Sequence, residues 1–119
     1  MNAADAFERG RAQYEAAARG LQSGDRVRVS NPQRGAVTAT VLHTTTPAAL
    51  PSLPHEWDEL KTRAVRRILE EWRVTNLALI TYRYGPRGQD RDVCFFALEI
   101  AGRWYDLKRQ PLTIERMEP

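Results

Sequence analysis

The residues best suited to chemistry are arginines and tyrosines that alternate near the middle of the C-terminal half. They stand in the run Tyr82-Arg83-Tyr84-Gly85-Pro86-Arg87-Gly88, and Arg91 follows closely. Aromatic rings stack on bases, and guanidinium groups bind phosphates. Together with the arginines of an earlier hairpin, this run predicts a nucleic-acid-binding surface made of Arg26, Arg28, Arg34, Arg83, Tyr84, Arg87 and Arg91. The alternative is that the tyrosines share an apolar strand face with Ile80, which we favour for Tyr82 and leave open for Tyr84.

The charge distribution supports a local basic face rather than a basic tail. Sixteen of the 18 basic residues are arginine, a type that pairs bidentately with phosphate or carboxylate. Residues 61–119 hold 12 basic and 8 acidic residues, whereas residues 1–60 hold 6 and 7. The excess is modest, and codon usage in an Ala-rich chain would also produce the arginine bias.

Catalytic groups are sparse. The two histidines, His43 and His55, are expected on a strand and at a helix start, where they are more often structural or solvated than ligands. Cys94 lies in the most apolar run, so we expect a buried and inert thiol. The sequence contains no phosphate-binding loop, nucleophile elbow or zinc-binding helix motif. We therefore expect a protein that is not an enzyme and that needs no cofactor or metal.

One spacing offers an enzymatic alternative. Asp92, followed after a hairpin by Asp106-Leu107-Lys108, is similar to the D…(D/E)xK arrangement of restriction-endonuclease-like nucleases. The resemblance implies two carboxylates that hold Mg²⁺ and a lysine that positions the attacking water. A small metal-dependent nuclease is the third of the functions considered, because such short matches arise readily in a charged chain.

Length and composition indicate one soluble domain. The chain has 119 residues, 42% of them hydrophobic, and a single cysteine, which excludes an intramolecular disulfide. No apolar run approaches the roughly 20 residues of a membrane span, and the acidic start, with Asp5 and Glu8, does not resemble a signal peptide. We expect a cytoplasmic protein without a membrane partner.

The periodicity predicts an N-terminal helix within residues 1–21 and one barrel-like domain over residues 22–119. Gly20 stands where a glycine would end the first helix. Alternating and β-branched runs predict six strands over residues 26–30, 36–45, 77–84, 93–100, 103–107 and 112–117. The run 93–100 is apolar on nearly both faces, so we expect a strand covered on both sides.

An amphipathic helix over residues 53–73 is predicted as an insertion between the second and third strands. Its apolar stripe is Leu53, Trp57, Leu60, Ala64, Ile68 and Trp72, widened by Val65 and Leu69. Acidic residues crowd its start and Arg73 stands at its end, which suits the helix dipole. The pairs Glu59 with Arg63, Arg66 with Glu70 and Arg67 with Glu71 are expected on its solvated face.

The first hairpin resembles a KOW-type motif of SH3-like barrels. The resemblance covers residues 24–41, in which Gly24-Asp25-Arg26-Val27-Arg28-Val29 is followed by a turn and by Gly35-Ala36-Val37-Thr38-Ala39-Thr40-Val41. It implies a binding module that contacts nucleic acid or protein, while an ordinary hairpin remains the alternative. The expected fold is α+β, a strongly bent antiparallel sheet or SH3-like barrel with an N-terminal helix and an inserted amphipathic helix.

The expected function is a small non-catalytic module that binds DNA or RNA through its arginine-rich face. The main alternative is a protein–protein interaction or assembly subunit, such as a homo-oligomer or a component of a phage or regulatory complex, in which uncovered apolar surface meets a partner. The residues expected in the core are Val27, Val29, Val41, Trp57, Leu60, Ile68, Trp72, Leu79, Ile80, Phe96, Leu98, Ile100 and Trp104.

Overall fold

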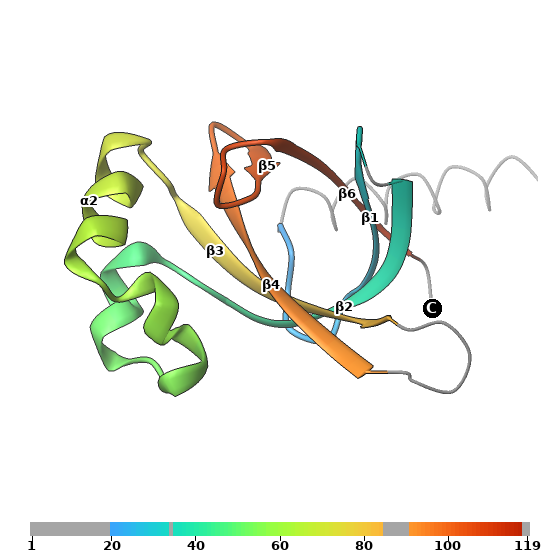
Figure 1. Cartoon of the computed structure of the whole chain (residues 1–119), viewed down its shortest axis with the longest axis horizontal. Coiled ribbons are helices and arrows are strands. Elements are labelled where there is room, and N and C mark those ends of the chain that lie inside the picture. Colours follow the sequence, from blue (N-terminus) through green and yellow to red (C-terminus); the bar gives the residue numbers. More distant parts are fainter. Residues whose placement is uncertain (1–19, 34, 85–90, 118–119) are drawn as a thin grey trace, which may run out of the picture.

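Six antiparallel strands close into a barrel in the computed structural model, which describes residues 20–33, 35–84 and 91–117 (Figure 1). Each strand pairs with the next along the chain, and the first pairs with the last to complete the closure. The strands are β1 (Arg26–Asn31), β2 (Gly35–Thr45), β3 (Asn76–Tyr84), β4 (Arg91–Ile100), β5 (Arg103–Tyr105) and β6 (Pro111–Arg116). The predicted barrel is confirmed, while the predicted N-terminal helix lies largely outside the described residues.

The closure of the barrel is held at the start of β1. The Asp25 carboxylate accepts a hydrogen bond from the Gln22 amide at 2.8 Å and from Arg116 Nε of β6 at 3.0 Å. Arg116 also donates to the carbonyl oxygen of Gly20. The turn before β1 and the last strand are therefore tied together by one partly buried ion pair.

The barrel encloses the first of two apolar clusters, which we call the barrel core. Alternate residues of each strand point inward, so that Val27 of β1 packs with Val41 of β2 and Ile80 of β3. Its buried members are Val27, Val29, Ala39, Val41, Ala78, Ile80 and Ala97. The inner side chains are mostly small and β-branched, which suits the narrow interior of a six-stranded barrel.

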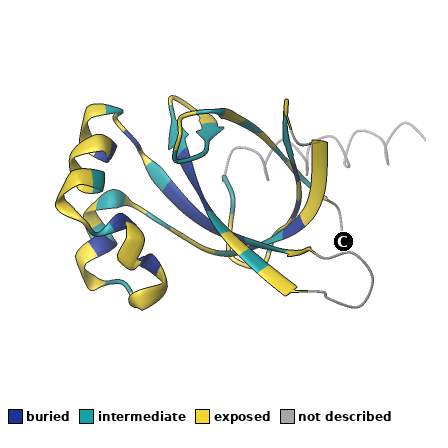
Figure 2. Cartoon of the chain, viewed as in Figure 1, coloured by how far each residue is buried: buried dark blue, intermediate teal, exposed yellow. Residues whose placement is uncertain are grey.

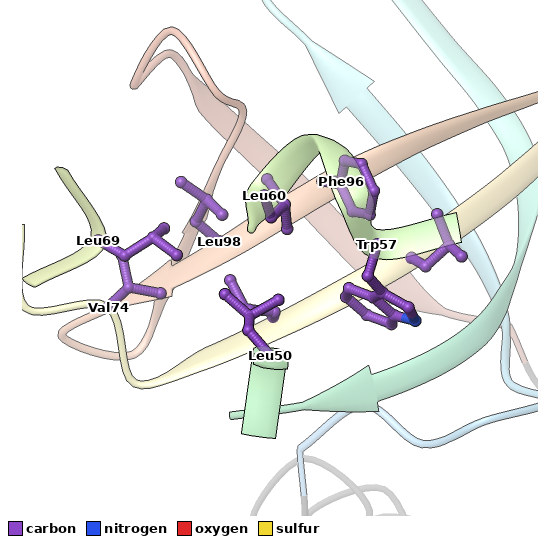
Figure 3. Packing of buried hydrophobic residues seen from close by; sticks show 9 residues of the cluster. Leu50, Trp57, Leu60, Leu69, Val74, Phe96 and Leu98 are labelled. Carbon is purple, nitrogen blue, oxygen red and sulfur yellow. The ribbon is translucent and has the colours of Figure 1, made fainter. Parts of the chain in front are cut away.

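The opposite face of β3 and β4 carries the second cluster, which we call the cap core (Figures 2 and 3). Leu77 and Leu79 alternate with the inward residues of β3 and pair across the ladder with Leu98 and Phe96 of β4. Trp57 lies against Phe96 with ring centroids 5.5 Å apart. Strand β4 is therefore covered on both sides at Phe96, Ala97 and Leu98, whereas Cys94, earlier on the predicted strand, is exposed.

The segment that supplies the cap core is not the single helix predicted over residues 53–73. It comprises the 3-10 helices η1 (Pro47–Ser52) and η2 (His55–Leu60) and the α-helix α2 (Arg63–Glu71). Thr62 takes an extended conformation (φ −61°, ψ 149°), and its side chain accepts the Val65 amide at 3.3 Å as an N-cap. A threonine in this role favours a new helix start over continuation. We call residues 47–74 the cap.

The break changes which side chains are buried. The expected stripe passed through Ala64 and Ile68, but Ala64 is exposed and Ile68 is 37% exposed. The restarted helix turns Val65 and Leu69, the residues expected to widen the stripe, toward the sheet, and Leu69 is only 2% exposed. The prediction that Ile68 lies in the core is therefore wrong by one helical position.

Most other core predictions are confirmed. Nine of the 13 expected residues are buried, namely Val27, Val29, Val41, Trp57, Leu60, Leu79, Ile80, Phe96 and Leu98. Trp72, Ile100 and Trp104 are only half-buried, at the edges of the two cores. Within the part of the chain that the structure describes, no helix has both the length and the apolar character needed to cross a membrane.

Candidate nucleic-acid interface

Strand β1 presents two arginines to solvent. Arg26 and Arg28 are exposed because the alternate residues, Val27 and Val29, fill the barrel core. Arg26 pairs in register with Thr40 of β2, which pairs in turn with Thr81 of β3. Neighbouring strands lie about 4.8 Å apart, so a guanidinium group and two hydroxyl groups form a row about 10 Å wide on the outer face.

Carboxylates flank the other arginines of this face. Arg28 pairs in register with Glu115 of β6. Arg83 is exposed near the end of β3, where its Nε lies 3.6 Å from Asp92 Oδ1 of β4. Both side chains of that ion pair are 74% exposed, so water screens it and a competing anion can replace the carboxylate at little cost.

The structure separates the roles of the two tyrosines. Tyr82 is half-buried against the barrel core and meets the Phe95 ring edge-on, with centroids 6.0 Å apart, as the strand periodicity predicted. Tyr84 is 55% exposed and pairs in register with the exposed Arg91. Tyr84 is therefore the ring that remains available for stacking. Arg34 and Arg87 lie outside the described residues.

The carboxylates of the nuclease-like spacing are not brought together. Asp92 pairs with Arg83, whereas Asp106 lies in the turn after β5 and accepts the backbone amides of Lys108 at 2.9 Å and Gln110 at 2.8 Å. Tyr105, next to Asp106, pairs with Leu98, six residues from Asp92 along β4. At about 3.4 Å per residue this is roughly 20 Å, too far for two carboxylates to share one Mg²⁺.

The remaining candidate groups for chemistry lie apart at the surface. His43 is exposed on β2, and His55 is exposed in η2 with its Nε2 3.6 Å from Glu56 Oε1. Cys94 is also exposed, so the expectation of a buried thiol is wrong. It shares the outer face of β4 with Phe96, but the cap covers Phe96 and does not cover Cys94. Among the described residues, no three His, Cys, Asp or Glu side chains lie close enough to hold a metal ion.

A second basic surface was not anticipated as a site. A cleft of about 960 Å³ opens in the cap, and four arginines line it: Arg63, Arg66, Arg67 and Arg73. Sequence reasoning placed three of them on the solvated face of a helix and Arg73 at its end. The spacing of Arg63, Arg66 and Arg67 does put them on one helix face, but only the folded cap brings that face against η1.

Comparisons of the chain with protein-family models, with curated proteins and with solved structures find no match. The closed six-stranded barrel, which is compatible with a small SH3-like barrel, is therefore the class that the structure itself defines.

Proposed function

We propose that this chain is a small β-barrel module that binds nucleic acid through the outer face of β1–β3 and the paired ends of β3 and β4 at Tyr84 and Arg91. The observation that carries the proposal is the row in which Arg26 aligns with Thr40 and Thr81. The Arg26 guanidinium and the Thr40 hydroxyl can donate to phosphate oxygens. The Thr81 hydroxyl borders them and donates to the Val93 carbonyl at 3.2 Å. The proposed surface comprises Arg26, Arg28, Arg34, Arg83, Tyr84, Arg87 and Arg91.

The fold supports this proposal by analogy. Residues 24–41 form the first hairpin of a closed antiparallel barrel, as they would in an SH3-like barrel with a KOW-type hairpin. Barrels of that kind commonly serve as binding modules rather than catalysts, so we propose no cofactor and no reaction. As part of the same proposal, we expect the protein to act in the cytoplasm.

The chemistry of the surface defines what it would bind. Phosphate contacts from a strand face hold a backbone without reading bases, so binding would tolerate many sequences. Tyr84 adds one stacking platform, which needs an unpaired base. We therefore expect single-stranded DNA or RNA to bind more tightly than duplex of the same length.

Fluorescence anisotropy with labelled single-stranded and duplex DNA and RNA tests the proposal. Affinity should fall steeply between about 50 and 200 mM salt, because bound cations are released from phosphates. A barrel double variant, Arg26→Gln with Arg28→Gln, should weaken binding to all sequences alike. It should also reduce the slope of log affinity against log salt concentration by the amount expected for the loss of up to about two phosphate contacts.

The matched control is a cap double variant, Arg63→Gln with Arg66→Gln, which removes the same charge from the other side of the molecule. It should leave oligonucleotide binding nearly unchanged. Equal losses in both variants would show a general charge effect, and no binding even at low salt would rule out the proposed function.

Protein assembly is the outcome to examine if nucleic acid does not bind. The large exposed hydrophobic side chains among the described residues are Val37, Ile68, Tyr84 and Met117. They lie on different elements, so they do not by themselves point to one partner surface.

A further inference from the structure

The cleft in the cap is lined by residues of η1 and α2. Figure 1 shows α2 on the side of the molecule away from β1. Leu50, Leu69 and Val74 line its bottom, but they belong to the cap core and are at most 9% exposed, so they shape the cleft and offer little surface to a ligand (Figure 3). Pro47 and Ala48 of η1 are less buried, and they supply the apolar surface that a ligand can reach. A small uncharged group could therefore lie against Pro47 and Ala48.

The rim of the cleft is strongly cationic. Arg63, Arg66, Arg67 and Arg73 line it together with a single acidic residue, Glu70, which gives four positive charges against one negative, +3. Arg67 has a partial partner in Glu71, 3.9 Å away, but both side chains are more than 60% exposed, so this pair is weak. The lining therefore carries more positive charge than the Glu70 carboxylate can neutralise.

The helix places these groups by simple periodicity. Residues 63, 66, 67 and 70 fall at i, i+3, i+4 and i+7 of α2, hence on one face. Val65 and Leu69 of the same helix anchor it to the sheet, so the arginine face has a fixed orientation. Figure 2 shows most of α2 exposed to solvent.

Arg73 adds an independent observation. The amide of Val74 donates to the carbonyl of Leu69 and that of Arg73 to the carbonyl of Glu70, the two bonds of a Schellman motif. Arg73 occupies the left-handed position of that motif at φ 56°, where glycine is the usual residue. The helix dipole favours a positive charge anywhere in the last turn of α2. The dipole therefore does not explain why an arginine occupies the left-handed position, where a residue other than glycine is strained. The strained position puts the fourth guanidinium in the lining of the cleft.

From these features we infer that the cap cleft binds a nucleotide, with its phosphates on the arginine rim and its base against Pro47 and Ala48. The four guanidinium groups are opposed by Glu70 in the lining and by Glu71 beside Arg67, which leaves an excess of positive charge for a chain of phosphates. Guanidinium forks bind phosphate oxygens bidentately. The Glu70 carboxylate can receive a hydrogen bond from a ribose hydroxyl or a base amino group. This site is separate from the nucleic-acid face proposed above.

Isothermal titration of the full chain with ATP, pyrophosphate and adenosine tests the inference. ATP should bind, pyrophosphate should bind more weakly because it lacks the base that meets Pro47 and Ala48, and adenosine should not bind detectably. The cap double variant, Arg63→Gln with Arg66→Gln, should weaken ATP binding by about tenfold or more, since it removes charge-assisted hydrogen bonds. The barrel double variant should leave ATP binding unchanged.

Arg73→Gly gives a second measurement that a folding defect does not mimic. Glycine relieves the left-handed strain, so the variant should melt at the same or a higher temperature while it binds ATP several-fold more weakly. The inference is overturned if ATP does not bind, if both double variants weaken it equally, or if an acidic peptide binds more tightly than ATP. Because the ATP and oligonucleotide assays use different variants, either proposal can fail without the other.

Discussion

At the scale of single residues, Asp106 is a structural anchor in the turn between β5 and β6. One of its carboxylate oxygens accepts two backbone amides, those of Lys108 and Gln110, in the manner of an Asx turn. That turn carries Arg109, whose guanidinium lies over the Trp72 ring at 5.4 Å from its centroid. Asp106 therefore helps to join the barrel to the edge of the cap core.

Replacing Asp106 tests this structural role. Asp106→Ala leaves both amides without their acceptor and should lower the free energy of unfolding by about 1–2 kcal/mol. Asp106→Asn keeps one oxygen at the same place and should lose about half as much or less. Urea unfolding followed by circular dichroism measures both. Equal stability of the alanine variant and the parent would show that the two bonds contribute nothing.

At the scale of elements, the cap shows how one capping residue changes a buried face. The prediction placed both Ile68 and Leu69 on the stripe of one helix, whereas the helix that starts after Thr62 buries Leu69 and leaves Ile68 37% exposed. The side chain of Lys61, just before the break, donates to the carbonyl of Leu53 and lies 3.0 Å from Asp58 Oδ1. These contacts hold η2 in its tight turn and separate it from α2.

Two adjacent alanine substitutions distinguish the two arrangements. Leu69→Ala creates a cavity in the cap core and should lower the free energy of unfolding by about 2–5 kcal/mol. Ile68→Ala removes a side chain that is 37% exposed, and its cost should stay below about 1 kcal/mol. Chemical denaturation of both variants under the same conditions provides the comparison. The reverse order of stabilities would favour one continuous helix.

At the scale of the whole molecule, β3 and β4 are the shared wall between the two cores. Ala78 and Ile80 face the barrel core, while Leu77 and Leu79 of the same strand face the cap core. Neither core can lose this wall without exposing the other. Barrel and cap should therefore unfold together rather than as separate units.

A substitution in one core, read out in the other, tests this coupling. Val41 lies in the barrel core, and Val41→Ala should lower the free energy of unfolding by about 1–3 kcal/mol. Its transition should shift equally by far-UV circular dichroism and by the fluorescence of Trp57, measured in a background with Trp72→Phe and Trp104→Phe. If the Trp57 transition stays in place while the dichroism transition moves, the cap folds independently.

The strands could be predicted from the sequence because their signal is local. β-branched residues, a period of two and glycine or proline turns delimit each strand to within a few residues. At Ala101-Gly102, both residues take positive φ (51° and 79°), as the tight reversal after β4 required. The apolar character of residues 93–100 on both faces predicted cover on both sides of the strand, which holds for Phe96, Ala97 and Leu98 and fails for the exposed Cys94.

The break in the cap and the arginine cleft depended on tertiary structure. The stripe from Leu53 to Trp72 fits one helix as well as two, because a threonine such as Thr62 can either cap a new helix or continue an existing one. In the folded chain, Thr62 caps α2, and Trp57 and Leu60 of η2 pack in the cap core. Likewise, the spacing of arginines along a helix does not show whether their side chains face solvent or lie beside a second element. The sequence alone determined which residues are charged and how they are spaced, whereas the tertiary structure decided which charges face one another, because long-range packing places α2 beside η1.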